Sequence, residues 1–144
     1  MKKTHEKAKR YLRTVRKMNV DVDNEVLEMA RLRALAEKIN SHISEAKVQA
    51  SGSQSRLEDT VLKLIEQEKK VSASVDKLME RQETIMVQID GLDDEYSRKV
   101  LRMYFIDGAR FLEIQKALKL SESAVYRYYD KGLTEFEKKY WEYF

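Results

Sequence analysis

The chain has 144 residues, enough for one ordinary domain or for a small domain beside a coiled coil. Charged residues make up 37%, Pro is absent and only four Gly occur, a composition that favours long uninterrupted helices. The absence of Cys excludes disulfides and thiolate chemistry and fits a reducing cytoplasm. No apolar run approaches the roughly 20 residues that span a bilayer, and the basic N-terminus lacks the apolar segment of a signal peptide. We therefore expect an all-α cytoplasmic protein that does not enter a membrane.

The net charge of +3 is concentrated at the N-terminus. Residues 1–20 hold eight Lys or Arg and one Glu, whereas residues 92–144 carry ten residues of each sign. Apolar residues recur at helical spacing within 2–18, which predicts a short basic amphipathic helix. Its apolar positions are Ala8, Tyr11, Leu12, Val15 and Met18. The basic side either contacts nucleic acid or an acidic protein surface, or is an ordinary solvated helix face.

A run rich in Asn and Asp, residues 19–23, is predicted to end this first helix. Either Asp23 or Asn24 can then cap a second helix that reaches about Ala50. Its apolar positions step by alternating threes and fours: Met29, Leu32, Ala36, Ile39, Ile43, Ala46 and Ala50. The Ser-rich stretch 51–55, which contains a Gly, is predicted to form a turn or linker.

Residues 54–90 have the strongest periodicity in the chain and are predicted to form a third helix. One unbroken heptad register fits its apolar residues, which indicates coiled-coil packing. The a and d positions include Leu57, Val61, Leu64, Val71, Val75, Leu78, Ile85, Ile89 and Leu92. Ile65, Met79 and Met86 add a row at e, which widens the stripe and suits a three- or four-helix assembly.

This wide apolar stripe needs partner helices. We favour an antiparallel hairpin in which the second helix folds back along the third at Gly52, and two such hairpins pair as a dimer or a higher oligomer. A single long parallel zipper is the alternative. Glu68 and Gln82 occupy a positions, where they either set the register or lie at a solvent-exposed edge. Residues 21–91 are therefore predicted to be the hairpin or coiled-coil oligomerisation region.

Residues 92–144 have the pattern of a trihelical helix-turn-helix domain. Gly108 lets the chain leave a helix over 96–106 and enter the next, and Ser121 can N-cap the last helix by accepting a free backbone N–H. The predicted core consists of Val100, Leu101, Tyr104, Phe111, Ile114, Leu118, Leu120, Val125, Tyr128 and Leu133. A compact unit of this kind can place its last helix in the major groove of DNA.

The order of residues in this segment resembles region 4 of sigma-70 factors. An apolar helix with a basic-aromatic end is followed by a Gly, a Glu-Ile pair, a Leu, a Ser cap, a Val and a closing Leu. In this chain they are Val100-Leu101-Arg102-Met103-Tyr104, Gly108, Glu113-Ile114, Leu118, Ser121, Val125 and Leu133. The layout of the whole chain is also similar to that of small phage transcription regulators, the ArpU- and RinA-like group. The sigma-like part covers about a third of the chain and region 2 has no counterpart, which argues against a stand-alone sigma factor.

The candidate DNA-binding residues lie on the last helix and just before it. The guanidinium of Arg127 can bind both acceptors of a guanine, and Ser123 and Tyr126 can reach a phosphate or a base edge. Glu122 suits the helix dipole but repels phosphate. Three lysines are placed for phosphate: Lys116, Lys119 and Lys131. The complete set is Ser121, Glu122, Ser123, Ala124, Tyr126, Arg127, Lys131, Lys116 and Lys119. The alternative is a solvated or protein-binding helix face.

The resemblance implies a sequence-specific regulator of phage or prophage genes. It would bind double-stranded DNA as a dimer or higher oligomer and contact RNA polymerase. Because residues 92–144 are neutral and phosphate contacts supply much of the affinity for DNA, dimerisation, the basic helix or polymerase would have to assist. Two other classes are alternatives: a small terminase-like packaging protein, and a polymerase-binding regulator that does not bind DNA.

No constellation of residues predicts an enzyme, a metal site or a cofactor. His5 and His42 share no ligand spacing with another His or Cys, and no Gly-rich phosphate loop or nucleophile motif occurs. The C-terminal nine residues include five aromatics. We expect them to extend the last helix and to pack Phe136 and Tyr140 on the core, with the other rings available to a partner.

Overall fold

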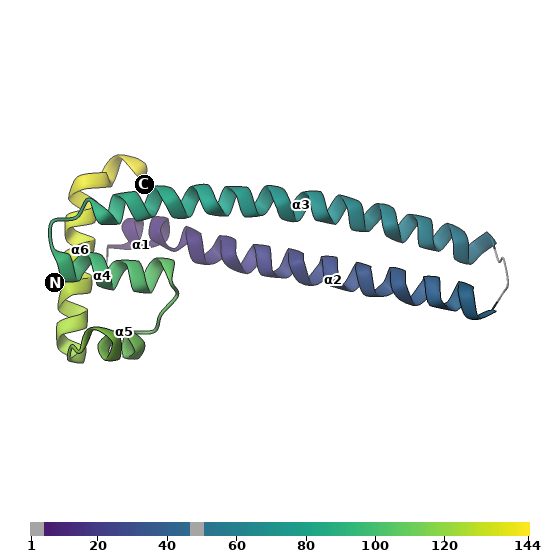
Figure 1. The fold of residues 1–144 in the computed structure, drawn as a ribbon. Helices are drawn as coiled ribbons and strands as arrows, with labels where there is room; N and C mark the ends of the chain where they lie inside the picture. Colours follow the sequence, from purple (N-terminus) through teal and green to yellow (C-terminus); the bar gives the residue numbers. More distant parts are fainter. Residues whose placement is uncertain (1–4, 47–50) are drawn as a thin grey trace. The chain divides into compact units, whose positions relative to one another are not determined.

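The computed structural model describes residues 5–46 and 51–144, and all regular structure in that part of the chain is helical (Figure 1). The elements are α1 (Glu6–Leu12), α2 (Thr14–Ala46), α3 (Ser51–Asp90), α4 (Glu95–Leu101), the π-helix η1 (Arg102–Ile106), α5 (Phe111–Leu118), α6 (Glu122–Tyr140) and the 3₁₀-helix η2 (Trp141–Tyr143). The predicted all-α class is confirmed. The chain divides into two compact units: the helix-turn-helix unit, Met1–Met18 with Leu78–Phe144, and the hairpin unit, Asn19–Lys77.

The N-terminal helix is built into the helix-turn-helix unit. The side chains of Ala8 and Leu12 in α1, and of Val15 in the first turn of α2, are fully buried there, as their helical spacing predicts. The Tyr11 hydroxyl donates a 2.7 Å hydrogen bond to Oε1 of Gln88, near the end of α3. The basic N-terminal segment is therefore anchored by its apolar side.

The predicted segment boundaries, after residues 20 and 91, do not coincide with those of the two units, which fall after residues 18 and 77. The last turns of α3 bury Leu78, Ile85 and Ile89 in the helix-turn-helix unit. A heptad register cannot reveal this division, because one long helix keeps its apolar stripe while it packs on different partners along its length.

The helix α2 runs without interruption through residues 19–23, where the sequence predicted a break. Asn and Asp are only moderately poor helix formers, and this stretch has no Gly or Pro, whose larger cost ends helices. The candidate caps Asp23 and Asn24 therefore lie inside α2. The break falls at Arg13, between α1 and α2.

The hairpin unit contains the predicted antiparallel pair formed by α2 and α3 (Figure 1). Nε2 of Gln67 donates to the backbone carbonyl of Glu25 at 2.9 Å. Nη2 of Arg33 lies 3.5 Å from Oε1 of Glu68. Because Glu68 is about half exposed, this predicted seam residue lies at the solvent-exposed edge of the pair. The arrangement is a hairpin and not a parallel zipper.

The stretch that was predicted to turn is helical. The helix α2 ends at Ala46 and α3 begins at Ser51, so residues 51–55 are the first turns of α3. Gly52, the predicted turning point, is helical and exposed. The predicted end of the second helix, Ala50, lies outside the described residues.

The helices α4, α5 and α6 follow one another in the predicted trihelical order, with one irregularity. The Ser121 hydroxyl accepts a 3.2 Å hydrogen bond from the N–H of Ala124 and thereby caps α6, as predicted. Gly108 has a positive φ of 72° and connects η1 to α5. The π-helix η1 interrupts the predicted helix over 96–106 after Leu101.

Half of the ten predicted trihelical core residues are buried, and the other half are half-buried: Tyr104, Phe111, Leu118, Leu120 and Tyr128. Phe105 and Tyr129 are buried, whereas Tyr128 is half-buried and stacks on Tyr96 with ring centroids 5.2 Å apart. The π-helical turn explains the burial of Phe105, because it changes the phase of the helix after Leu101. Tyr129 is buried because it lies one helical step of four residues after Val125 on α6. The fully buried predicted residues are Val100, Leu101, Ile114, Val125 and Leu133.

The close approach of α4 and α6 depends on Gly132, which the sequence pattern did not single out. A Cβ at this position would lie 2.9 Å from Cδ1 of Leu101 and 3.2 Å from Cβ of Ser97. The Ser97 hydroxyl donates a 2.9 Å hydrogen bond across the same contact, to the carbonyl of Tyr128. A larger residue at 132 would force the two helices apart, and overpacking of this kind costs typically about 1–3 kcal/mol.

Candidate nucleic-acid interface

The connection between α5 and α6 has the form that a helix-turn-helix requires. Three residues, Lys119 to Ser121, separate the two helices, which is within the usual three to four. Lys119 adopts the left-handed conformation with φ 56°, and the N–H of Leu120 donates to the carbonyl of Gln115 at 3.0 Å. This ending satisfies a free carbonyl at the end of α5. Together with the Ser121 cap, it fixes the direction in which α6 leaves the turn.

The first two turns of α6 present a polar face to solvent. Val125 and Tyr129 point into the core, and the exposed predicted site residues lie on the other side of the helix. The exposed members of the predicted set on α6 and its cap are Ser121, Glu122, Ser123, Tyr126, Arg127 and Lys131, and Ala124 is half-buried. The first two turns are the part of a recognition helix that contacts base edges in helix-turn-helix proteins.

Two aromatic contacts hold the exposed face in place. The Tyr126 ring, 45% exposed, packs on Phe111 with centroids 4.8 Å apart. The guanidinium of Arg127 lies 5.2 Å from the ring centre of Tyr128, within the range of a cation–π interaction. These contacts restrict both side chains while their polar ends stay accessible, so both are partly ordered before any ligand arrives.

An aromatic cluster around the buried Tyr129 supports this face from behind. Tyr104 stacks on Phe111 at 4.8 Å and meets Tyr129 edge-on at 5.5 Å. Burial raises the pKa of Tyr129 to about 12, so its hydroxyl stays protonated at neutral pH. The sequence placed Tyr104 and Phe111 in the core. It missed Tyr129, although the four-residue step from Val125 was a signal for it.

The three candidate phosphate-binding lysines differ in their surroundings. Lys116 and Lys119 are exposed beside the turn. Nζ of Lys131, in contrast, lies 3.1 Å from Oδ1 of Asp94, the cap of α4. Burial raises the pKa of the Asp94 carboxyl, but hydrogen bonds from Ser97 and Lys131 outweigh it and leave the pKa below its ordinary value. Lys131 must give up this pair to reach a phosphate.

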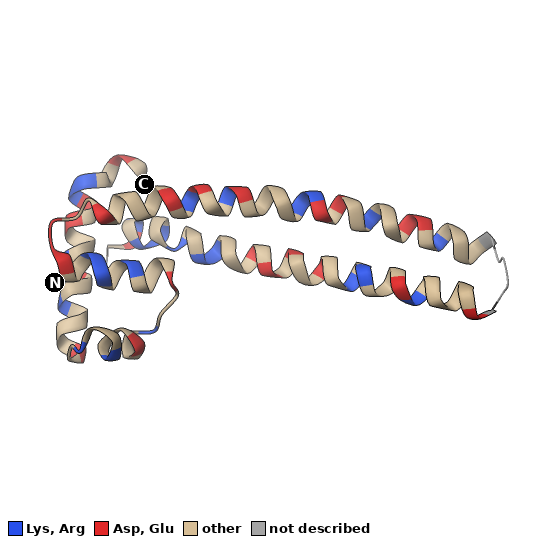
Figure 2. Ribbon diagram, viewed as in Figure 1, with Lys and Arg blue, Asp and Glu red and all other residues tan. Residues whose placement is uncertain are grey.

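The positive charge of the chain belongs to the same unit as this face. The sequence of the helix-turn-helix unit contains nineteen Lys or Arg and fourteen Asp or Glu, a net charge of +5. The hairpin unit carries the remaining −2 and mixes both signs along its helices (Figure 2). The neutrality of residues 92–144 is thus offset by the N-terminal helix.

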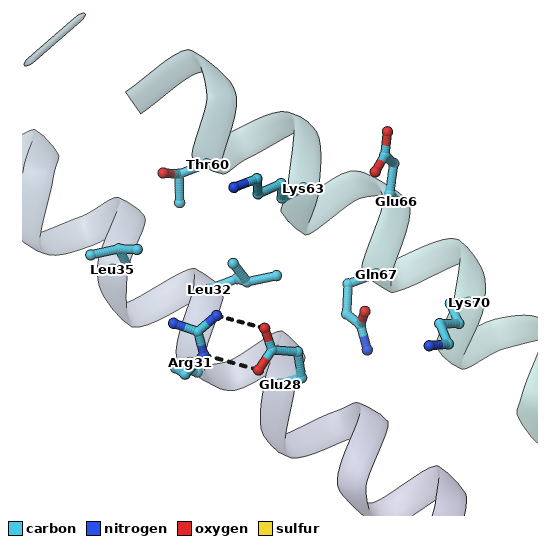
Figure 3. A pocket seen from close by; sticks show the side chains of 9 residues that line it. All are labelled: Glu28, Arg31, Leu32, Leu35, Thr60, Lys63, Glu66, Gln67 and Lys70. Carbon is cyan, nitrogen blue, oxygen red and sulfur yellow. Dashed lines mark hydrogen bonds and ion pairs between the residues drawn. The ribbon is translucent and has the colours of Figure 1, made fainter. Parts of the chain in front are cut away.

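The hairpin unit has an open groove of about 510 Å³ between α2 and α3 (Figure 3). Its centre is lined by Leu32 and by Thr60, whose hydroxyl donates to the carbonyl of Arg56 in its own helix. A Glu28–Arg31 ion pair with a 2.6 Å contact lies at the edge. The polar side chains that line the groove either bond within the protein or face solvent, which is typical of a loosely packed helix seam.

The part of the chain that the structure describes has no group of three His, Cys, Asp or Glu residues placed to hold a metal ion.

The fold and the candidate face define an all-helical chain with a helix-turn-helix unit. Residues 37–137 match the model of the family described as "Protein of unknown function (DUF1492)", and the chain belongs to this family. The match begins within α2 and ends within α6, so it includes the last part of α2, all of α3 and the candidate face. A search of curated proteins and a search of solved structures gave no match. None of the described helices is long and apolar enough to cross a membrane.

Proposed function

We propose that this chain is a sequence-specific DNA-binding regulator of phage or prophage transcription, and that α6 reads the duplex. The observation that supports this most is the exposed first half of α6, capped by Ser121 and held behind a three-residue turn. Its exposed side chains combine hydrogen-bonding groups with a guanidinium instead of a continuous charged pattern. Such a face suits base edges in a major groove, which is wide enough to admit a helix.

In this proposal the residues of the face have separate roles. Arg127 donates two hydrogen bonds to a guanine. Phosphate repels the carboxylate of Glu122, so this side chain faces a base and accepts a hydrogen bond from a cytosine amino group. Ser123 and Tyr126 bind a phosphate or a base edge. Lys116 and Lys119 bind phosphates that flank the groove and fix the register of the protein on the duplex.

Selection of duplexes from a random-sequence pool by the purified full chain tests this proposal. We expect enrichment of one motif, in two copies whose centres are separated by about 34 Å or a multiple of it if a dimer binds. A pool that stays random would contradict sequence-specific reading. If the chain binds RNA polymerase but binds no duplex, the result would favour the alternative function, a polymerase-binding regulator that does not bind DNA.

Oligomerisation through the hairpin unit is part of the proposal. Among its described residues only Leu32, Ile39 and Thr60 are buried, which is little for a unit of this length. Its large exposed apolar residues are Val20, Val26, Leu27, Val61, Leu62 and Ile65. Since a small unit rarely folds stably without a larger core or a partner, a second hairpin would cover these positions.

The exposed rings of Trp141 and Tyr143 in the other unit supply a surface for RNA polymerase.

Replacement of both Leu27 and Leu62 by glutamate should dissociate the oligomer. These side chains are 67% and 60% exposed in the single chain, so the change does not disturb its own packing but places charges in the proposed interface. Sedimentation equilibrium should give at least twice 17.1 kDa for the native chain and about 17.1 kDa for the variant. The control Asn40→Glu with Gln54→Glu adds the same charge at exposed polar positions and should stay oligomeric. A native chain that sediments as a monomer would contradict the proposal.

A further inference from the structure

The solvent side of α1 and of the first turn of α2 carries a row of cations. Figure 2 shows Lys and Arg gathered along this segment. The exposed cations are Lys7, Arg10, Arg13, Arg16 and Lys17. Between them, Ala8, Leu12 and Val15 are fully buried in the helix-turn-helix unit. The row therefore belongs to a docked helix with a fixed inner side.

Little within the protein neutralises this row. Among the described residues, none of the five cations forms an ion pair, and Glu6 is the one acidic residue in α1. Arg16 donates to the carbonyl of Tyr104 at 3.3 Å and lies over its ring, and neither of these contacts supplies an acidic group. Closely spaced like charges repel one another, and a polyanion removes that cost when it binds.

The row is held at a defined place beside the candidate reading helix. The helices α1 and α6 are in direct contact. The Tyr11 ring packs against Phe136 of α6 with centroids 6.1 Å apart. Nζ of Lys9 lies 6.0 Å from the ring centre of Tyr129, which is two residues after Arg127. The basic helix therefore crosses α6 directly after the exposed first turns.

This spacing matches the dimensions of a DNA groove. Packed helices lie about 8–10 Å apart, and the major groove is about 12 Å wide. If α6 occupies the groove, the helix packed beside it comes next to the sugar-phosphate backbone at the groove edge. We propose that the exposed cations of α1 and early α2 form a second DNA contact, a phosphate-binding surface that supplies most of the electrostatic affinity. This inference rests on the proposed function and adds a site to it.

Salt titration with a random-sequence duplex tests this site, because phosphate contacts release counterions whatever the base sequence. The variant with Lys7→Gln, Arg10→Gln and Arg13→Gln removes three charges from exposed positions of the full chain. For this variant we expect the slope of log K against log salt to fall by about 2–3, since each lost phosphate contact reduces it by about 0.9. The affinity near 0.1 M salt should fall at least about tenfold for the same reason.

A matched control removes three lysines from exposed positions of the hairpin unit: Lys69→Gln, Lys70→Gln and Lys77→Gln. Its slope should equal that of the native chain. Circular dichroism checks that each variant keeps its helices. If the triple variant loses them, Arg10→Gln alone should still lower the slope by about 0.9.

The results separate this inference from the proposed function. A native chain that binds the duplex, with an unchanged slope in the α1 variants, overturns the second contact and leaves α6 as the DNA-binding element. An unchanged slope together with lost binding to an acidic protein would assign the row to a protein partner. A native chain that binds neither random nor selected duplexes overturns both proposals.

Discussion

Replacement of Phe136 by alanine is expected to lower the free energy of unfolding of the helix-turn-helix unit by about 3–5 kcal/mol, the usual cost of truncating a buried aromatic ring. The Phe136 side chain is fully buried. Its ring lies 6.1 Å from that of Tyr11 in α1, 4.9 Å from that of Tyr140 and 6.0 Å from that of Phe144. Truncation would leave a cavity where both ends of the chain meet α6, so it should also loosen the basic helix.

Urea unfolding followed by near-ultraviolet circular dichroism measures this effect. All eight Tyr and the one Trp belong to the helix-turn-helix unit, so the signal reports on that unit and not on the hairpin. Trp141→Ala is the matched control, because it removes a larger ring that is 65% exposed and should change stability by no more than about 0.5 kcal/mol. Similar losses in the two variants would show that Phe136 is not the centre of a shared core.

The elements that the sequence predicted correctly are those with local signals. Ser121 precedes an apolar helical pattern, so the cap and start of α6 could be placed from neighbouring residues alone. The antiparallel pairing followed from two apolar stripes on one chain, since each stripe needed a partner. The prediction that the chain turns at Gly108 was correct for the same local reason, because few other residues adopt its positive φ.

The features that the sequence did not reveal depend on contacts between distant residues. Tyr11 bonds Gln88, 77 positions away, and nothing in the periodicity of either helix specifies that partner. The uninterrupted course of α2 was missed for another reason. The Asn and Asp residues in 19–23 disfavour a helix only weakly, and packing along a long helix exceeds that cost.

The candidate site was partly predictable. Arg127 and Ser123 are exposed because they lie opposite the apolar stripe of α6, and that stripe could be recognised in the sequence. The pairing of Lys131 with Asp94 could not be recognised, because it joins residues 37 positions apart. The basic row on α1 was visible as charge, but its position beside α6 required the packing of Tyr11 and Phe136.

Truncation of Arg127 has the largest expected effect on the discrimination between DNA sequences. Its side chain is exposed in the second turn of α6 and lies against the Tyr128 ring, so it can meet a guanine without a large ordering cost. Arg127→Ala should cost about 1–3 kcal/mol on a selected duplex, because a bidentate contact to one base is lost. Lys116→Ala is the control, since loss of a phosphate contact should weaken binding to every sequence alike.

The most direct test of the central claim is the ratio of affinities for a selected duplex and a scrambled duplex, measured by fluorescence anisotropy at one salt concentration. We expect Arg127→Ala to reduce this ratio about 5- to 150-fold, which corresponds to the loss of 1–3 kcal/mol at one base. Lys116→Ala should leave the ratio unchanged. A native chain without preference for the selected duplex, or an Arg127→Ala variant that loses equal affinity for both duplexes, would contradict the assignment of α6 as a DNA-reading helix.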